Sequence, residues 1–172
     1  MYAGKTSLLL ELYEQNILKG KSVCSFVHPN DNRYSENHIT SHTGKSIPAI
    51  KFEQLDQWKN YVNEYNVVLI DEVQFFNPQI ISTVKEMSEA GKDVILSGLS
   101  MDYKNQPFGS MQDLILFADQ TFTLTGDCFI CDKPSTHTFR KSRHYAQVVI
   151  GNSDIYESLC IDCYNKKTEN VL

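Results

Sequence analysis

The sequence has no long hydrophobic run, no export signal, no excess of positive charge and one tryptophan in 172 residues. Its longest purely apolar runs are about four residues, far short of the roughly 20 that a membrane-spanning helix needs. No charged start leads into an apolar stretch with a small-residue cleavage site, so we expect a cytoplasmic protein. The net charge of −5 gives no general attraction to nucleic acid or to an anionic membrane, and we expect neither partner.

Cysteine is also scarce, but four of the five cysteines form two C-x-x-C pairs, Cys128 with Cys131 and Cys160 with Cys163. Two such pairs can supply four thiolates to one tetrahedral zinc, which would then be structural because no position is left for water. The alternative is two disulfides, which the lack of an export signal disfavours. The 28 residues between the pairs exceed the spacing of about 15–20 in common zinc ribbons and imply an inserted hairpin or loop. Cys24 lies in an apolar run and is interpreted as a buried small hydrophobe.

Apolar periodicity predicts strands that alternate with helices up to residue 126. The predicted helices are 7–19, 78–90 and 111–118, and residues 52–63 also show helical spacing. The predicted strands are 22–27, 67–70, 94–96 and 121–125. The predicted loops are 28–44 and 98–109. Beyond Asp127 the sequence predicts short strands at 136–140 and 147–150, and no helix. This pattern indicates a parallel α/β domain, residues 1–126, followed by a small β-rich zinc-binding domain, residues 127–172.

The chain opens with Gly4-Lys5-Thr6, which matches the end of the phosphate-loop pattern G-x-x-x-x-G-K-[ST]. In such a loop the lysine neutralises the β- and γ-phosphates, and the threonine hydroxyl binds Mg²⁺. The tripeptide alone is a weak signal, but a helix directly follows it. Asp71-Glu72 at the end of the apolar run 67–70 matches the acid that holds Mg²⁺ in these folds. The alternative is that both acids are solvated charges at a strand end.

Together these motifs resemble the type II thymidine kinases of bacteria, animal cytosol and poxviruses. The resemblance covers essentially the whole chain. It lies in residues 1–6, 31–34, 41–44, 71–76, 98–103 and 106–109, in both cysteine pairs, and in Ile150-Gly151 with Tyr156. It implies a P-loop nucleotide-binding parallel sheet with helices on both faces. It also implies that the segment between the cysteine pairs is a lasso that closes over the nucleoside.

The resemblance implies transfer of the γ-phosphoryl group of ATP to the 5′-hydroxyl of thymidine, and of deoxyuridine, in nucleotide salvage. Glu72 would be the general base, and Asp71 and Thr6 would hold Mg²⁺. The phosphate-binding residues would be Gly4, Lys5, Thr6, Ser7 and Arg33. The substrate-binding residues would be Met1, Asp31, Phe75, Leu99, Tyr103, Phe108, Thr138, Val149, Ile150, Gly151 and Tyr156. Phe75 and Phe108 could instead be ordinary core residues.

The family also implies a homotetramer packed through the α/β domain and feedback inhibition by thymidine triphosphate. Three departures stand out: Ser100 replaces the usual aspartate, Gln106 is a neutral variant, and the first glycine and preceding strand of the phosphate loop are missing from this sequence. We therefore expect an N-terminally incomplete core, and a catalytically weak or inactive nucleotide-binding homologue is the alternative. A zinc-ribbon nucleic-acid module is a third reading, based on a modest basic cluster of Lys133, Arg140, Lys141, Arg143 and His144.

Overall fold

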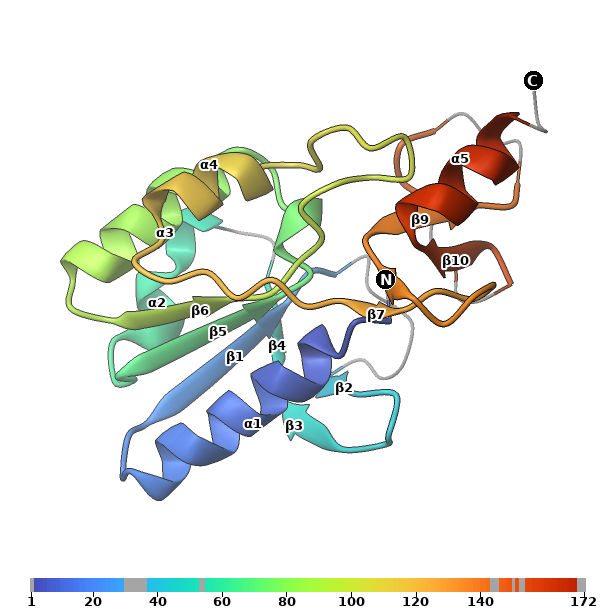
Figure 1. Ribbon diagram of the computed structural model, residues 1–172. Coiled ribbons are helices and arrows are strands. Elements are labelled where there is room, and N and C mark those ends of the chain that lie inside the picture. Colours follow the sequence, from blue (N-terminus) through green and yellow to red (C-terminus); the bar gives the residue numbers. More distant parts are fainter. Residues whose placement is uncertain are drawn as a thin grey trace.

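The centre of the protein is a four-stranded parallel sheet in the order β4-β1-β5-β6 (Figure 1). The structure is a computed structural model and describes residues 2–29, 37–52, 55–142, 146–149, 151 and 154–169. The strands are Val23–Val27 (β1), Ile50–Lys51 (β4), Val67–Asp71 (β5) and Asp93–Leu96 (β6). Every residue of β1 and β5 is buried, as expected for parallel strands covered on both faces. The strands predicted at 22–27, 67–70 and 94–96 are thereby confirmed.

Helices cover both faces of this sheet, as predicted (Figure 1). On one face, α1 (Lys5–Leu18) packs Leu9 and Leu10 against a cluster that includes Val67 and Leu69. On the other, α3 (Gln79–Glu89) and α4 (Met111–Phe117) pack against a cluster that includes Val68 and Ile70. Alternate residues of β5 therefore serve the two cores, because successive side chains of a strand point to opposite faces. Each fully buried aliphatic side chain contributes about 1.5–3 kcal/mol to this packing.

Residues 121–125 form no strand, so that prediction was wrong. Among the described residues, β6 pairs only with β5 and its outer edge has no partner strand. A cavity of about 880 Å³ is lined by β6, by residues 121–125 and by apolar side chains of α1 and α4. The β-branched and aromatic pattern of 121–125 favours an extended chain, but a strand also needs a neighbour with which to exchange backbone hydrogen bonds.

Two further elements differ from the sequence-based expectation in the first part of the chain. The loop predicted at 28–44 contains a strand, because His38–Thr40 (β2) forms an antiparallel hairpin with Ser46–Pro48 (β3). Ile39 and Ile47 are buried by this pairing against the α1 face of the sheet. The helical spacing at 52–63 becomes a short 3₁₀ turn, Leu55–Gln57 (η1), and one helical turn, Lys59–Val62 (α2).

The C-terminal part builds a second, smaller body beside the N-terminus (Figure 1). It contains two antiparallel pairs, Gly126–Asp127 (β7) with Pro134–Ser135 (β8), and His137–Arg140 (β9) with Tyr156–Leu159 (β10). The prediction of no helix here was wrong, because Ile161–Glu169 forms α5, which packs Cys163 against Cys128 and Leu159. The strand predicted at 147–150 does not form in the described residues 147–149, since β9 pairs with β10 instead.

None of the helices in the described residues combines the length and the apolar character that crossing a membrane requires.

Candidate active site

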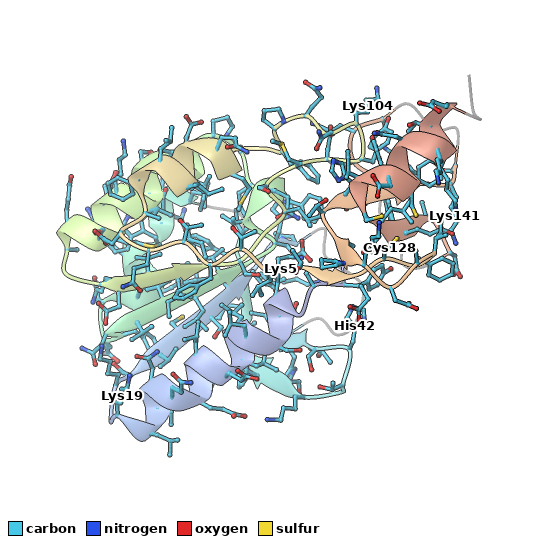
Figure 2. The ribbon with its side chains drawn as sticks, in the orientation of Figure 1. Lys5, Lys19, His42, Lys104, Cys128 and Lys141 are labelled. Carbon is cyan, nitrogen blue, oxygen red and sulfur yellow. The ribbon has the colours of Figure 1, made fainter. Side chains whose placement is uncertain are left out.

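The amino end of α1 opens onto a cavity of about 110 Å³, which is lined by residues of the α/β part and of the C-terminal body. Gly4 precedes the helix with φ 74° and ψ 16°, a left-handed conformation that glycine adopts without steric cost. Lys5, Thr6 and Ser7 follow in the first turn and line the cavity. Lys5 lies where the sheet meets the body that carries Cys128, whereas Lys19 lies at the far end of α1 (Figure 2). A helix amino end with a lysine in its first turn can bind phosphate.

Asp71 brings a carboxylate from the end of β5 to the same place. The Thr6 hydroxyl donates to Asp71 Oδ2 over 3.4 Å, and both residues line the cavity. Burial and, to a smaller extent, the charge of Glu72 raise the pKa of Asp71 to about 6, although hydrogen bonds and the charge of Lys5 oppose the change. A hydroxyl and a carboxylate are oxygen ligands of the kind that Mg²⁺ prefers, and a bound cation would offset the cost of ionising Asp71.

Glu72 occupies an unusual backbone conformation directly after the strand. Its φ of 51° and ψ of 42° are left-handed, which costs a residue with a side chain about 1–3 kcal/mol. Its backbone N–H donates to Asp71 Oδ1 at 2.9 Å, and the Gln74 side chain donates to Glu72 Oε2 at 2.5 Å. Glu72 is 7% exposed and lines the cavity beside Asp71. A buried carboxylate held in this way is suited to accept a proton from a hydroxyl.

Aromatic and apolar side chains form the opposite part of the cavity. Phe75 and Phe108 pack edge to face with their ring centres 5.7 Å apart, and Leu99 and Tyr103 line the wall beside them. The Tyr156 hydroxyl donates to the backbone oxygen of Val149 at 2.7 Å and thereby fixes that segment. A flat, apolar slot with a few polar groups is typical of a site for an aromatic base.

The structure brings nearly all the predicted nucleotide and nucleoside residues together. The predicted residues that line this one cavity are Gly4, Lys5, Thr6, Ser7, Asp71, Glu72, Phe75, Leu99, Tyr103, Phe108, Thr138, Val149, Gly151 and Tyr156. Met1, Asp31, Arg33 and Ile150 lie outside the described residues. The individual roles assigned to these side chains stay predictions.

Sequence reasoning missed a set of contacts that ties the C-terminal body to the wall of the cavity. The Arg140 guanidinium lies 3.3 Å from the ring centre of Tyr103, and it donates to the backbone oxygens of Ala146 and Gln147. The Gln147 side chain in turn donates to Asp102 Oδ2 at 2.9 Å. Gln147 and Asp102 both line the cavity. No local signal marks these pairs, because their members lie 37 to 45 residues apart in the chain.

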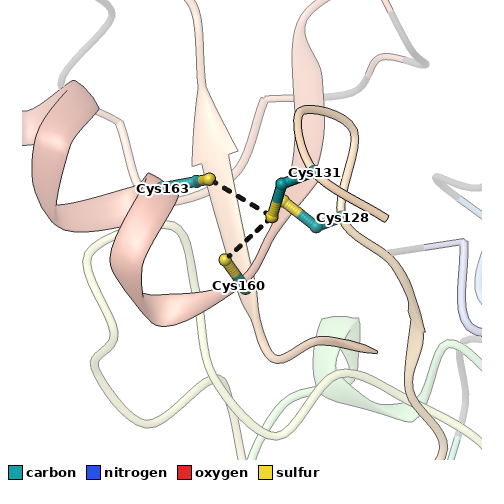
Figure 3. Close-up of side chains that lie close together, drawn as sticks. All are labelled: Cys128, Cys131, Cys160 and Cys163. Carbon is teal, nitrogen blue, oxygen red and sulfur yellow. Dashed lines mark hydrogen bonds between the residues drawn. The ribbon is translucent and has the colours of Figure 1, made fainter. Parts of the chain in front are cut away.

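The four predicted zinc ligands cluster in the C-terminal body (Figure 3). Cys131 Sγ lies 3.6 Å from the sulfurs of both Cys160 and Cys163, and all four sulfurs lie within 4.8 Å of one another. A tetrahedron with Zn–S bonds of about 2.3 Å has S–S edges of about 3.8 Å, and the two distances of 3.6 Å are close to this value. All five cysteines are free thiols rather than the two disulfides considered as an alternative.

The charge of the cluster also favours a cation. Burial opposes ionisation of Cys128, but backbone N–H groups of Cys160, Ile130 and Cys131 lower its pKa to about 6. Burial and the neighbouring sulfurs raise the pKa of Cys163 to about 12. Four thiolates so close together repel one another without a cation, so the residues fit a bound zinc and the metal would hold the two knuckles together.

Three of the five residues in the predicted basic cluster make contacts that the structure describes. Lys133 pairs with Asp162 at 3.1 Å, Lys141 pairs with Glu157 at 3.3 Å, and Arg140 is 5% exposed. Arg143 and His144 lie outside the described residues.

Fold and site together define an α/β protein of the nucleotide-binding class with a cluster of four cysteines that could hold a metal ion. The sequence profile of the thymidine kinase family matches residues 1–164. The chain is 34% identical to a thymidine kinase of Mycoplasma mobile over 95% of this chain and 82% of that protein. It is 32% identical to one from Thermococcus kodakarensis over 93% and 87%, and 32% identical to one from Bacteroides fragilis over 96% and 83%. The chain belongs to the thymidine kinase family.

Proposed function

We propose that the protein transfers the γ-phosphoryl group of ATP to the 5′-hydroxyl of thymidine, giving thymidine monophosphate and ADP. One observation carries the proposal: a helix amino end with Lys5 and Thr6, an acidic pair and an aromatic slot all line one cavity. Phosphoryl transfer needs positioned cations and one base rather than covalent chemistry. The thymidine kinases of the related organisms agree with this reading.

In this proposal Lys5 and the amino end of α1 hold the phosphates, and Thr6 and Asp71 hold Mg²⁺. The metal, when bound with ATP, neutralises charge that develops on the transferred group. Phe75 and Phe108 hold the base, and Glu72 accepts the proton of the 5′-hydroxyl. Glu72 is largely buried, which limits the contact of its carboxylate with bulk water. Arg33 and Asp31 keep their expected roles at the phosphates and the sugar.

Deoxyuridine is proposed as a second, poorer substrate. It differs from thymidine by one methyl group, and a missing group of this size in an apolar wall costs roughly 10–200-fold in specificity. Thymidine triphosphate is proposed as an inhibitor because the same cavity offers aromatic side chains to its base and the amino end of α1 to its phosphates. A homotetramer packed through the α/β domain is also proposed, on the resemblance to the family alone.

We propose that residues 1–126 and 127–172 act as a kinase domain and a zinc-binding lasso domain. The central sheet ends before residue 126, and the cysteine cluster lies wholly after it. The contacts between Arg140 and Tyr103, and between Gln147 and Asp102, would then join the two domains across the nucleoside slot.

Nucleotide binding without turnover is the alternative, and one observation favours it. The outer edge of β6 has no strand partner among the described residues, and a cavity of about 880 Å³ extends from there to α1. A cavity at this place removes packing contacts from α1, the helix whose amino end would bind phosphate.

A coupled ADP-release assay with thymidine, deoxyuridine, deoxycytidine and deoxyadenosine distinguishes these readings. The proposal expects turnover with the two pyrimidines that carry a 4-carbonyl group and none with the others. ATP binding by calorimetry without ADP release would instead support the alternative, and no binding of ATP or thymidine would refute both.

A further inference from the structure

Gln74 is a buried amide at which three segments of the active-site region meet. It lies two residues after Glu72, in the 3₁₀ turn Val73–Phe75 (η2), and it is 3% exposed. Its Nε2 donates to Glu72 Oε2 at 2.5 Å. Its Oε1 accepts from the backbone N–H of Leu99 at 3.0 Å. One side chain therefore connects the carboxylate of the site with the loop that forms part of the aromatic slot.

These two hydrogen bonds also fix which way the amide faces. If the amide were turned over, its NH₂ group would meet the N–H of Leu99 and its oxygen would meet the carboxylate of Glu72. Both contacts would then join like groups, donor to donor and acceptor to acceptor. The Gln74 amide thus presents a donor to Glu72 in one orientation only.

Two glycines pack against Gln74 from other parts of the chain. A Cβ atom at Gly98 would lie 2.6 Å from Gln74 Oε1, and one at Gly109 would lie 2.2 Å from the backbone oxygen of Gln74. Both distances are too short for a real Cβ, so any other residue would displace Gln74 or its own loop. Glycine at these two motif positions therefore serves the close packing around this amide.

We propose that Gln74 is a positioning residue that aims the Glu72 carboxylate at the acceptor hydroxyl and holds the Leu99 backbone at the nucleoside slot. The proposal rests on the proposed function. Glu72 has a strained backbone conformation, and the Gln74 amide donates a hydrogen bond to its carboxylate. Because a misplacement of about 1 Å can cost roughly 100-fold in rate, this hydrogen bond sets the efficiency of the base.

The test is a double-mutant cycle with Gln74→Met and Glu72→Ala, read as kcat and as KM for thymidine. Methionine keeps the length of glutamine but neither donates to Glu72 nor accepts from Leu99. We expect kcat to fall roughly 10–100-fold and KM to rise several-fold. In the Glu72→Ala background, Gln74→Met should change kcat by less than about twofold, because the group through which it acts is gone.

A second variant separates the two contacts. Gln74→Glu keeps an acceptor for the Leu99 N–H but places a second carboxyl group against Glu72, which competes for its proton, so kcat should fall while KM stays close to that of the wild type. Gln57→Met, on an exposed glutamine, is the matched control and should leave both constants unchanged. If Gln74→Met does not fold, Gly98→Ala displaces the amide without removing it and should also lower kcat.

These experiments distinguish failure of the positioning role from failure of the proposed function on which it rests. An active wild type with unchanged kcat in Gln74→Met, or equal losses with and without Glu72, overturns the positioning role and leaves the proposed function intact. Gly98→Ala with wild-type constants overturns it equally. A wild type that neither binds nor phosphorylates thymidine refutes the proposed function, and the positioning role fails with it.

Discussion

The guanidinium of Arg140 lies 3.3 Å from the centre of the Tyr103 ring, and this contact joins the C-terminal body to the wall of the active-site cavity. Arginine suits this place because its planar group can stack on a ring while it donates to two backbone oxygens, here those of Ala146 and Gln147. The position of the C-terminal residues that line the cavity therefore depends on the buried guanidinium of Arg140.

Arg140→Lys should weaken nucleoside binding more than ATP binding. Lysine keeps the charge but loses the stacked plane and the pair of hydrogen bonds, so we expect KM for thymidine to rise roughly tenfold. KM for ATP should change less than threefold, since Arg140 contacts no residue of the phosphate-binding loop in the described chain. Steady-state kinetics with each substrate varied in turn provides the measurement. An equal rise in both KM values would contradict this assignment.

Glu72→Ala should abolish most turnover while leaving binding of thymidine and ATP largely intact. Loss of a general base lowers rates by about 10²–10⁴-fold. The coupled assay measures turnover, and calorimetry measures binding. Glu11→Ala, on the exposed side of α1, is the control and should behave as the wild type. The base assignment is refuted if Glu72→Ala keeps more than about a tenth of wild-type turnover.

Cys128→Ser should release the metal and unfold the C-terminal body. We expect one zinc per wild-type chain by elemental analysis and almost none in the variant, because the cluster then has three thiolates. The Cys24→Ala control should keep its zinc, since Cys24 lies in the core between sheet and helices. Proteolysis after chelation should cut within the C-terminal body first. A wild type without bound metal would refute the zinc site.

Glu157→Gln should destabilise the C-terminal body in a way that depends on pH. Burial raises the pKa of Glu157, but Lys167 and Lys141 outweigh burial and lower it below its ordinary value. The folded pKa is thus below the unfolded one. The stabilisation is therefore complete above the unfolded value of about 4.3 and is lost as the pH falls through the folded value.

We expect the variant to be less stable than the wild type by roughly 1–2 kcal/mol at pH 7. The difference should shrink at pH values below about 4. Urea unfolding of both chains at each pH measures it, and any loss of zinc in acid affects both alike. Asp154→Asn, on an exposed aspartate, is the control. A difference that stays constant from pH 7 to pH 3 would rule out the ion pairs as its cause.

Some of the fold was predictable because its signals are local. The continuous apolar run at 67–70 defines β5, and Asn77 before Pro78 marks the start of α3, where the Asn77 side chain accepts from the Gln79 N–H at 2.9 Å. Other elements depend on partners elsewhere in the chain. Residues 121–125 have strand-like composition but pair with no strand of the described chain, and α5 is stabilised where Cys163 meets Cys128.

The sequence by itself determined the family, the alternation of helices and strands, and the residues suited to hold phosphate, base and zinc. Those conclusions depend on residue types and spacings that are read along the chain. Only the tertiary structure decided that Lys5, Asp71, Phe108 and Tyr156 line one cavity. It alone revealed the Gln74 amide between Glu72 and Leu99, because that contact joins residues 25 positions apart. Hydrogen bonds between distant segments follow from the path of the folded backbone, and no local pattern encodes that path.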